Sequence, residues 1–274
     1  MPYLELTDGV PLYYAEQGRG PAVVLLHGWT MNSTFWAANV PALAASHRVV
    51  TVDLRGHGES GKTPDGHDLA QYARDVRALF DHLALDDVAL VGWSMGADVI
   101  LSYVEQYGCD RLRAAVFVDQ SPRFLDAVGW RFPLLGGYSP VDLAVFAQGF
   151  RHDRPSVVKP FIAACFADSP ADDVVDAAYA QTTKTPTDAA LALWMNMAHA
   201  DLRPVLPRVR VPVLLIYGER SRIFPGDLAG WLVAHLPDAR AVPFPNSGHV
   251  PFAEEPERFN DVVNAFLLGS PDPT

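Results

Sequence analysis

Short, continuous apolar runs alternate along the chain with segments that repeat apolar residues at helical spacing. Such runs are typical of strands that are buried on both faces of a sheet. They cover residues 23–26, 49–52 (where Thr51 is the one polar residue), 88–91, 114–118 and 213–217. Helical spacing between the second and third runs is shown by Leu69, Tyr72, Val76, Leu79 and Leu83. Strands that alternate with helices form parallel sheets with right-handed crossovers, so we predict an α/β fold with a mostly parallel central sheet flanked by helices.

Both ends of the chain extend this pattern. Residues 3–16 alternate apolar and polar side chains around Asp8-Gly9, which predicts an antiparallel hairpin with a two-residue turn. We also expect a frayed tail at 269–274. The remaining expected elements are a helix near 34–45, a helix near 227–236, a short strand at 239–244 and a helix at 256–268.

The pattern changes between residues 121 and 203, where no buried-strand run occurs. This block instead holds helical stretches rich in aromatic residues, Ala and Met, at 141–150, 156–167, 171–181 and 187–199. We predict a helical cap at 121–203, inserted after the sixth strand, and a core made of 1–120 and 204–274. Open α/β sheets bind ligands at the carboxyl edge, and we expect the cap to lie over that edge.

Composition narrows the function classes. The chain has 274 residues, of which 49% are hydrophobic, and a formal net charge of −11, which argues against nucleic acid or anionic membrane as a partner. We expect neither a signal peptide nor a membrane span, and a cytoplasmic protein that is a monomer or homodimer. Cys109 and Cys165 are expected to be small core residues. Because the sequence contains no metal-ligand cluster and no Gly-rich phosphate loop, we predict no metal and no cofactor.

Gly92-Trp93-Ser94-Met95-Gly96 joins the third apolar run to a helical segment. In a strand–turn–helix context this G-x-S-x-G spacing is typical of a strained turn that presents the serine hydroxyl to a cleft. The two glycines let neighbouring backbone pass close to the turn on both sides. A serine that only caps the following helix is the alternative interpretation.

Further motifs occur in a fixed order along the sequence. His27-Gly28-Trp29 follows the first buried run, residues 53–60 read Asp-Leu-Arg-Gly-His-Gly-Glu-Ser after the second, and Asn246-Ser247-Gly248-His249 follows the last strand. With the serine motif, this order resembles the α/β-hydrolase superfamily over nearly the whole chain. The residues that flank the His-Gly pair and the serine look most like small bacterial esterases and cofactor-free haloperoxidase-like serine hydrolases.

Ser94 is a weak nucleophile at neutral pH and needs a base within hydrogen-bond reach. His249 suits this role because the ordinary pKa of a histidine, about 6.5, lies close to working pH. The fold that the resemblance implies brings the His249 loop back over Ser94. The resemblance also implies structural roles for His27 and His57.

The acid that would orient the histidine is less clearly marked. The family usually carries Gly-x-x-Asp after the strand at 213–217, but here the aspartate's position holds Ser221. Asp119 ends the preceding strand, where some branches of the superfamily look as though they carry their acid. We predict Asp119 as the acid, with Glu219 as the alternative, and Asp227 or no acid also open.

The resemblance further implies that the backbone N–H groups of Trp29 and Met95 form an oxyanion hole. An apolar substrate pocket is expected to include Trp130, Phe146, Trp194, Met195 and Val250.

These expectations indicate a serine hydrolase that cleaves small to medium carboxylic esters or lactones through an acyl-enzyme. The expected partner is therefore a small-molecule ester or lactone. Alternatives are cleavage of a thioester or C–C bond, haloperoxidase-like perhydrolysis, or a non-catalytic receptor for a small ligand on the same fold. Fold-level analogy does not choose among them.

Overall fold

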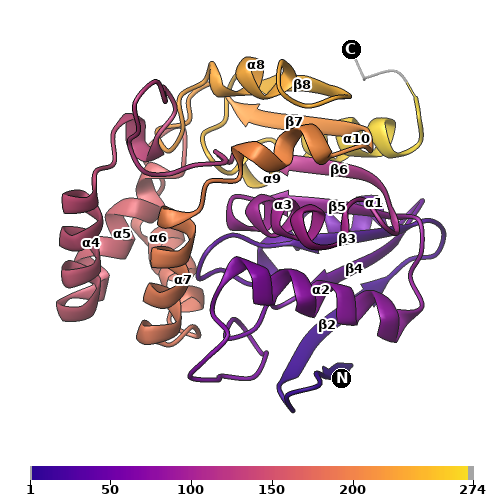
Figure 1. Ribbon diagram of the computed structural model, residues 1–274, viewed down its shortest axis with the longest axis horizontal. Helices are drawn as coiled ribbons and strands as arrows, with labels where there is room; N and C mark the ends of the chain where they lie inside the picture. Colours follow the sequence, from indigo (N-terminus) through magenta and orange to yellow (C-terminus); the bar gives the residue numbers. More distant parts are fainter. Residues whose placement is uncertain (1, 271–274) are drawn as a thin grey trace.

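The computed structural model describes residues 2–270, which are built around one eight-stranded sheet (Figure 1). The strand order is β1-β2-β4-β3-β5-β6-β7-β8. Six neighbouring strands are parallel: β3 (Ala22–Leu26), β4 (Arg48–Val52), β5 (Val88–Trp93), β6 (Leu112–Val118), β7 (Val213–Gly218) and β8 (Ala239–Phe244). Every residue of β3, β5 and β7 is buried, so the predicted buried strands and the mostly parallel sheet are confirmed.

The N-terminal hairpin is present, but its turn is longer than predicted. β1 (Tyr3–Glu5) pairs antiparallel with β2 (Pro11–Gln17), and the last pair is Glu5 with Pro11. The Leu6 N–H still donates to the Val10 carbonyl at 3.0 Å, so the turn consists of residues 7–9, and the predicted two-residue turn at Asp8-Gly9 is wrong. Gly9 donates its N–H to the Leu6 carbonyl at 2.8 Å and adopts a φ of +79°, which glycine tolerates without strain.

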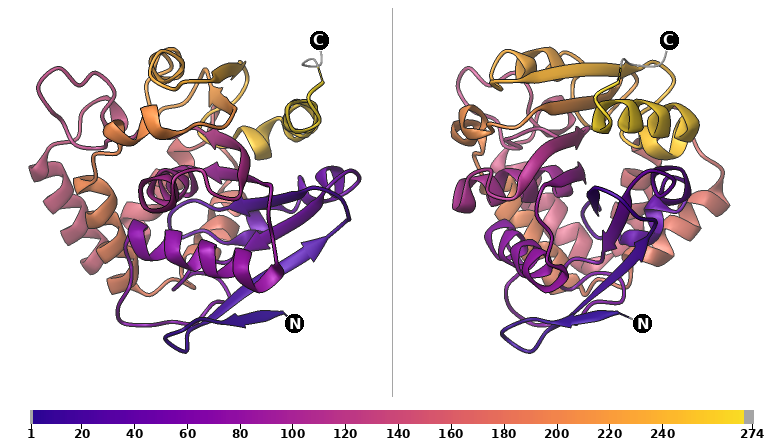
Figure 2. Two further views of the ribbon diagram at one scale, coloured as in Figure 1. Left: turned by 45° about the vertical axis from the view of Figure 1, so that its right-hand side comes forward. Right: turned by 90° about the vertical axis from the view of Figure 1, so that its right-hand side faces the viewer.

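Helices cover both faces of the sheet. The right-hand view of Figure 2 shows α2 and α3 on one face and α1 and α10 on the other. The bounds are α1 (Val40–Leu43), α2 (Leu69–Leu83), α3 (Met95–Tyr107), α8 (Leu228–Val233), α9 (Pro251–Glu254) and α10 (Pro256–Leu267). Within residues 2–270, no helix combines the length and apolar character that a bilayer crossing requires.

The helix expected near 34–45 is interrupted. A 3₁₀ turn at Ser33–Trp36 is followed by α1, which has only one turn. Pro41 lies in the first turn of α1 and has no N–H to donate to the carbonyl of residue 37, so a helix that begins here is favoured over one that continues through it.

Four helices between β6 and β7 form a separate layer, which we call the helical layer. Figure 1 shows it beyond the carboxyl ends of the parallel strands. Its members are α4 (Pro140–His152), α5 (Arg154–Ala164), α6 (Asp172–Thr182) and α7 (Thr187–His199), close to the predicted ranges. Ser139 caps α4 in a reciprocal capping box with Asp142, which explains why that helix begins there. The chain returns to β7 through a Pro-containing 3₁₀ segment, Arg203–Arg208.

The structure describes only the first two residues of the predicted frayed tail at 269–274. Gly269 adopts a φ of +67°, and Ser270 donates its N–H to the Ala265 carbonyl at 2.8 Å, so these two residues close α10 rather than fray. The rest of the predicted tail, 271–274, lies outside the described residues.

The strand order reverses direction next to β3. After β3 the chain forms β4 on one side, then crosses to form β5 on the other side. The carboxyl ends of β3 and β5 therefore meet at a topological switch point, which is where open α/β sheets bind ligands.

Candidate active site

The predicted site residues follow different strands but converge at one edge of the sheet. Trp29 comes three residues after the end of β3, Ser94 directly after β5, Asp119 directly after β6, and His249 five residues after β8. Parallel strands present their carboxyl ends at a single edge, which explains how residues so far apart in sequence come together.

Ser94 occupies a sharp, strained turn. Its φ of 52° and ψ of −124° lie outside the regions that non-glycine residues normally adopt. A Cβ added to Gly92 would overlap the backbone of Gly96, and a Cβ added to Gly96 would overlap the carbonyl of Leu26. The two glycines thus allow β5, α3 and β3 to approach closely enough to hold Ser94 in this conformation.

We expect Gly96→Ala to lower the free energy of unfolding by about 1–3 kcal/mol or more, because the new methyl group must displace backbone of β3. Gly230→Ala is the matched control: Gly230 lies in α8, is exposed, and has open space around its Cα. That change should raise stability by about 0.5–1 kcal/mol. Urea unfolding of both variants measures the effect, and equal stabilities of the two variants would contradict this account of the turn at Ser94.

His249 and Asp119 form a buried pair. The distance from His249 Nδ1 to Asp119 Oδ1 is 3.2 Å, and the two side chains are 2% and 0% exposed. The distance is that of an ion pair, but the orientation falls short of hydrogen-bond geometry, so Nδ1 has no hydrogen-bond partner among residues 2–270. Such contacts are often poorly aligned in active sites without substrate. The two atoms nevertheless lie within hydrogen-bond distance of each other.

Backbone contacts hold the His249 loop in place. The His249 N–H donates to the Cys165 carbonyl at 2.7 Å, and the Trp93 indole N–H donates to the His249 carbonyl at 2.9 Å. His249 is thereby tied both to the segment after α5 and to the residue before Ser94.

The Asp119 carboxylate is held by two further donors. Ser221 Oγ donates to Oδ1 at 3.2 Å, and the Gly218 N–H lies 3.4 Å from Oδ2. Ser221, which stands where the family usually has an aspartate, therefore touches Asp119 itself. The two alternative acids lie elsewhere: Glu219 is exposed, and Asp227 pairs with Arg131 at 2.8 Å.

The backbone N–H groups of Trp29 and Met95 are free to bind a ligand, because neither donates a hydrogen bond to another group among residues 2–270. Met95 is the first residue of α3, where the N–H groups have no partner within the helix. The Trp29 side chain is anchored separately, since its indole N–H donates to the Ala190 carbonyl of α7 at 2.8 Å.

Ser94 and His249 line one small cavity. The rest of its lining is mainly apolar and consists of Gly28, Trp29, Met31, Trp93, Phe161, Cys165 and Trp194. A second small cavity shares Met31, Trp93 and Cys165 with it and has an entirely apolar lining. The cavity with Ser94 is therefore bordered by Ser94, His249 and Trp29, and Met95 follows Ser94 directly in the chain.

The predicted pocket residues divide into two groups. Trp194 lines the cavity with Ser94, Val250 lines the neighbouring cavity, and Phe146 stacks on Trp194 with ring centroids 4.7 Å apart. Trp130 and Met195 lie elsewhere. The Trp130 ring packs against Phe132 and Trp231, and Met195 is 37% exposed on the outer side of α7. Adjacent residues of a helix point in different directions, so Trp194 and Met195 cannot both face the cavity.

Met31 and Cys165 line the cavity but were not predicted as pocket residues. Cys165 is buried, as predicted, and burial raises the pKa of its thiol well above the ordinary value. Cys165 directly follows α5, four residues after Phe161, and this helical spacing was an available signal because residues four apart lie on the same face of a helix.

His27 and His57 use both ring nitrogens within the core. His27 Nε2 accepts from the Leu54 N–H at 3.0 Å and Nδ1 donates to the Gly28 carbonyl, tautomers being assigned from these partners. His57 Nε2 accepts from the Thr30 N–H at 3.2 Å. Burial lowers the pKa of both rings and so favours their neutral forms. Their hydrogen bonds connect the loop after β3 to the loop after β4.

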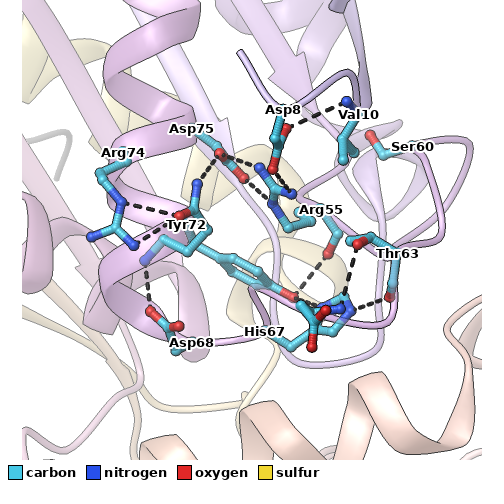
Figure 3. Close-up of polar contacts among 12 residues, drawn as sticks. Asp8, Val10, Arg55, Ser60, Thr63, His67, Asp68, Tyr72, Arg74 and Asp75 are labelled. Atoms are coloured by element: carbon cyan, nitrogen blue, oxygen red, sulfur yellow. Dashed lines mark hydrogen bonds and ion pairs between the residues drawn. The ribbon is translucent and has the colours of Figure 1, made fainter. Parts of the chain in front are cut away.

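A buried ion pair fixes the loop after β4 (Figure 3). Arg55 donates to both oxygens of Asp75 on α2, at 2.8 and 2.9 Å, and to Asp8 at 2.6 Å. The Tyr72 hydroxyl donates to the Arg55 carbonyl at 2.8 Å. These contacts tie the loop after β4 to α2 and to the N-terminal hairpin.

A serine on a strand-to-helix turn, above a mostly parallel sheet, is the architecture of a hydrolase fold, and comparison with known proteins agrees. Residues 21–256 match the family described as alpha/beta hydrolase fold. The chain therefore belongs to the α/β-hydrolase fold family, as the sequence motifs predicted.

Relatives within this family include named esterases. A pimeloyl-[acyl-carrier protein] methyl ester esterase of Nitrosomonas europaea is 32% identical over 254 residues, which cover 90% of this chain and 96% of the relative. Among solved structures, an esterase of Exiguobacterium antarcticum superposes with a TM-score of 0.91 at 25% identity, covering 97% of this chain and 98% of that one. A bromoperoxidase of Bacillus anthracis gives a TM-score of 0.88 at 26% identity and covers 94% and 96%.

Proposed function

We propose that this protein is a serine hydrolase that cleaves small to medium, uncharged carboxylic esters through an acyl-enzyme. One observation carries the proposal: Ser94 and His249 line the same small cavity, while the far nitrogen of His249 lies 3.2 Å from the buried Asp119 carboxylate. These positions support Ser94 as nucleophile, His249 as base and Asp119 as acid, the set of roles that acyl transfer requires.

In the proposed mechanism, Ser94 Oγ attacks the ester carbonyl carbon while His249 Nε2 takes the hydroxyl proton. The carbonyl oxygen becomes an oxyanion that accepts hydrogen bonds from the backbone N–H groups of Trp29 and Met95. His249 then returns the proton to the leaving alcohol, and an acyl ester of Ser94 remains. Water, deprotonated by His249, attacks this ester and releases the acid. Asp119 holds the ring and stabilises its charged form.

The helical layer serves in this proposal as the cap over the site. The cap spans 121–203 and the catalytic core is 1–120 with 204–274. Support comes from the aromatic contacts across the boundary, where Trp29 of the core packs on Phe150 and Trp194 with ring centroids 5.3 and 4.5 Å apart. A cap in this position excludes water from the reaction.

The apolar lining supports an uncharged substrate. A carboxylate buried in a cavity of this kind without a partner is strongly disfavoured. We expect p-nitrophenyl acetate and butyrate to be hydrolysed with a kcat/KM at least about tenfold above that of p-nitrophenyl hemisuccinate, since each 1.4 kcal/mol of lost transition-state stabilisation corresponds to tenfold. Release of p-nitrophenolate at pH 7.5 measures all three.

Two outcomes of that assay would count against the proposal. Preference for the charged hemisuccinate would contradict the substrate class. No turnover of any neutral ester would contradict ester hydrolysis and favour binding without catalysis. The bromoperoxidase neighbour makes peroxide a useful second acceptor, because the same acyl-enzyme would pass its acyl group to hydrogen peroxide and form a peracid.

A further inference from the structure

Asp98 and Gln120 form a buried polar pair beside the proposed triad. Asp98 lies in the first turn of α3, four residues after Ser94, and Gln120 directly follows Asp119. Asp98 is 2% exposed and Gln120 is 3% exposed. Gln120 Nε2 donates to Asp98 Oδ2 at close range, which is the one hydrogen bond of the Asp98 carboxyl group within residues 2–270. The pair links the helix of the nucleophile to the loop of the acid.

If Asp98 is ionised, two buried oxygen atoms of this pair have no hydrogen-bond donor among the described residues. Asp98 Oδ1 and Gln120 Oε1 are both buried, and neither has a hydrogen-bond partner among the described residues. Both atoms are acceptors, so they cannot satisfy each other without a proton. No cation within residues 2–270 pairs with Asp98, and a buried carboxylate without one is strongly disfavoured. A proton on Oδ1 supplies the missing donor.

We propose that Asp98 is a neutral carboxylic acid joined to Gln120 by two hydrogen bonds, and that the pair is a positioning device for the proposed triad. In this pair the Asp98 O–H donates to the amide oxygen while the amide N–H donates to the acid carbonyl. The positioning role rests on the function proposed above, whereas the neutral pair does not.

The backbone of Gln120 is also held by hydrogen bonds. The Tyr217 hydroxyl of β7 donates to the Gln120 carbonyl at 2.5 Å and accepts from the Gln120 N–H at 3.3 Å. Side chain and backbone of Gln120 are therefore held from α3 and from β7 at the same time. Asp119, one residue earlier, adopts a φ of +45° that needs such support.

The titratable groups around the pair are Asp119 on the loop after β6 and Tyr217 on β7. Burial raises the pKa of the Asp98 carboxyl well above its ordinary value, and the hydrogen bond from Gln120 opposes this only in part. The folded chain thus holds a proton that the unfolded chain loses above about pH 3.9. The stabilisation that this proton provides is complete below that pH and is lost as pH rises toward the folded pKa.

Exchanging acid and amide provides the test. The variants are Asp98→Asn, Gln120→Glu, and the double variant that carries both, which restores an acid–amide pair with the partners exchanged. Asp98→Asn, which is close in shape to the neutral acid, should lower kcat by less than about threefold, because a hydrogen bond between neutral groups is retained. Gln120→Glu places two carboxyl groups together and should lower kcat by up to about 10²-fold with little change in KM, through misplacement of Asp119. The double variant should recover most of that loss.

Two measurements report on the pair without ester turnover. Infrared difference spectra of wild type minus Asp98→Asn at pH 7 should show the C=O band of a protonated carboxyl group. The stability of Asp98→Asn relative to wild type should increase from pH 4 to pH 8, because the variant has no proton to lose. Absence of that band, or a pH-independent difference, would overturn the neutral pair. If the infrared band and the pH-dependent stability difference are both observed but the double variant recovers no kcat, the positioning role is overturned. Failure of the wild type to hydrolyse any ester would instead overturn the proposed function.

Discussion

Ser94→Ala is expected to lower kcat/KM for p-nitrophenyl acetate by about 10⁴- to 10⁶-fold, because Ser94 is the proposed acyl carrier and burial raises the pKa of Cys165, the thiol that lines the same cavity, so that it is a poor replacement. The residual rate should come from binding and from the N–H groups of Trp29 and Met95, which the substitution leaves in place. Steady-state release of p-nitrophenolate, with the spontaneous rate subtracted, gives the ratio.

Ser102→Ala is the matched control for this loss. Ser102 lies on the same helix, α3, is buried, and does not line either cavity. The same chemical change at this position should leave kcat/KM within about twofold, as expected for a substitution away from the reacting groups. If Ser94→Ala kept a tenth or more of the activity, acyl transfer through Ser94 would be wrong, and general-base chemistry by His249 on water would have to be considered instead.

Asp119→Asn is expected to lower kcat by about 10³- to 10⁴-fold at pH 7.5, because a neutral amide neither stabilises the charged imidazole nor fixes its tautomer. Circular dichroism and urea unfolding should show a folded protein, since asparagine has the same shape and Ser221 still has an oxygen to which it can donate. The kinetic loss should therefore appear in kcat rather than in folding.

Glu219→Gln and Asp227→Asn are the controls, each an identical removal of charge from an alternative acid. Glu219 is exposed and Asp227 forms a surface ion pair with Arg131, so both variants should keep at least about half of the wild-type kcat. A collapse of activity in Glu219→Gln together with a silent Asp119→Asn would show that the acid has been assigned to the wrong strand.

The fold could be predicted from the sequence because its strongest signals are local. The continuous apolar runs required strands buried on both faces, and the five predicted strands occur in the structure. The incorrect predictions concern segments whose conformation depends on contacts with residues far away in the sequence. In the turn at 7–9, Asp8 is bonded to Arg55, 47 residues away, a contact that no local turn pattern contains.

The triad acid is a similar case. Asp119, Glu219 and Asp227 are all acidic residues near strand ends, and the sequence left them open. The choice depends on which side chain points inward beside His249, which is set by the register of β6 against β7, where Val118 pairs with Ile216. The same limit applied to the pocket: Trp130 and Trp194 look alike in sequence, but Trp194 lines the cavity with Ser94 whereas Trp130 packs against Phe132 and Trp231.

Covalent labelling tests the central claim most directly. Dimethyl p-nitrophenyl phosphate is small and uncharged, and an activated serine displaces p-nitrophenolate from it and keeps the dimethylphosphoryl group. The account predicts release of one equivalent of p-nitrophenolate per protein chain and, by mass spectrometry of peptides, a dimethylphosphoryl group on Ser94; Ser94→Ala should release none. Labelling of another residue, or equal release by Ser94→Ala, would contradict the account.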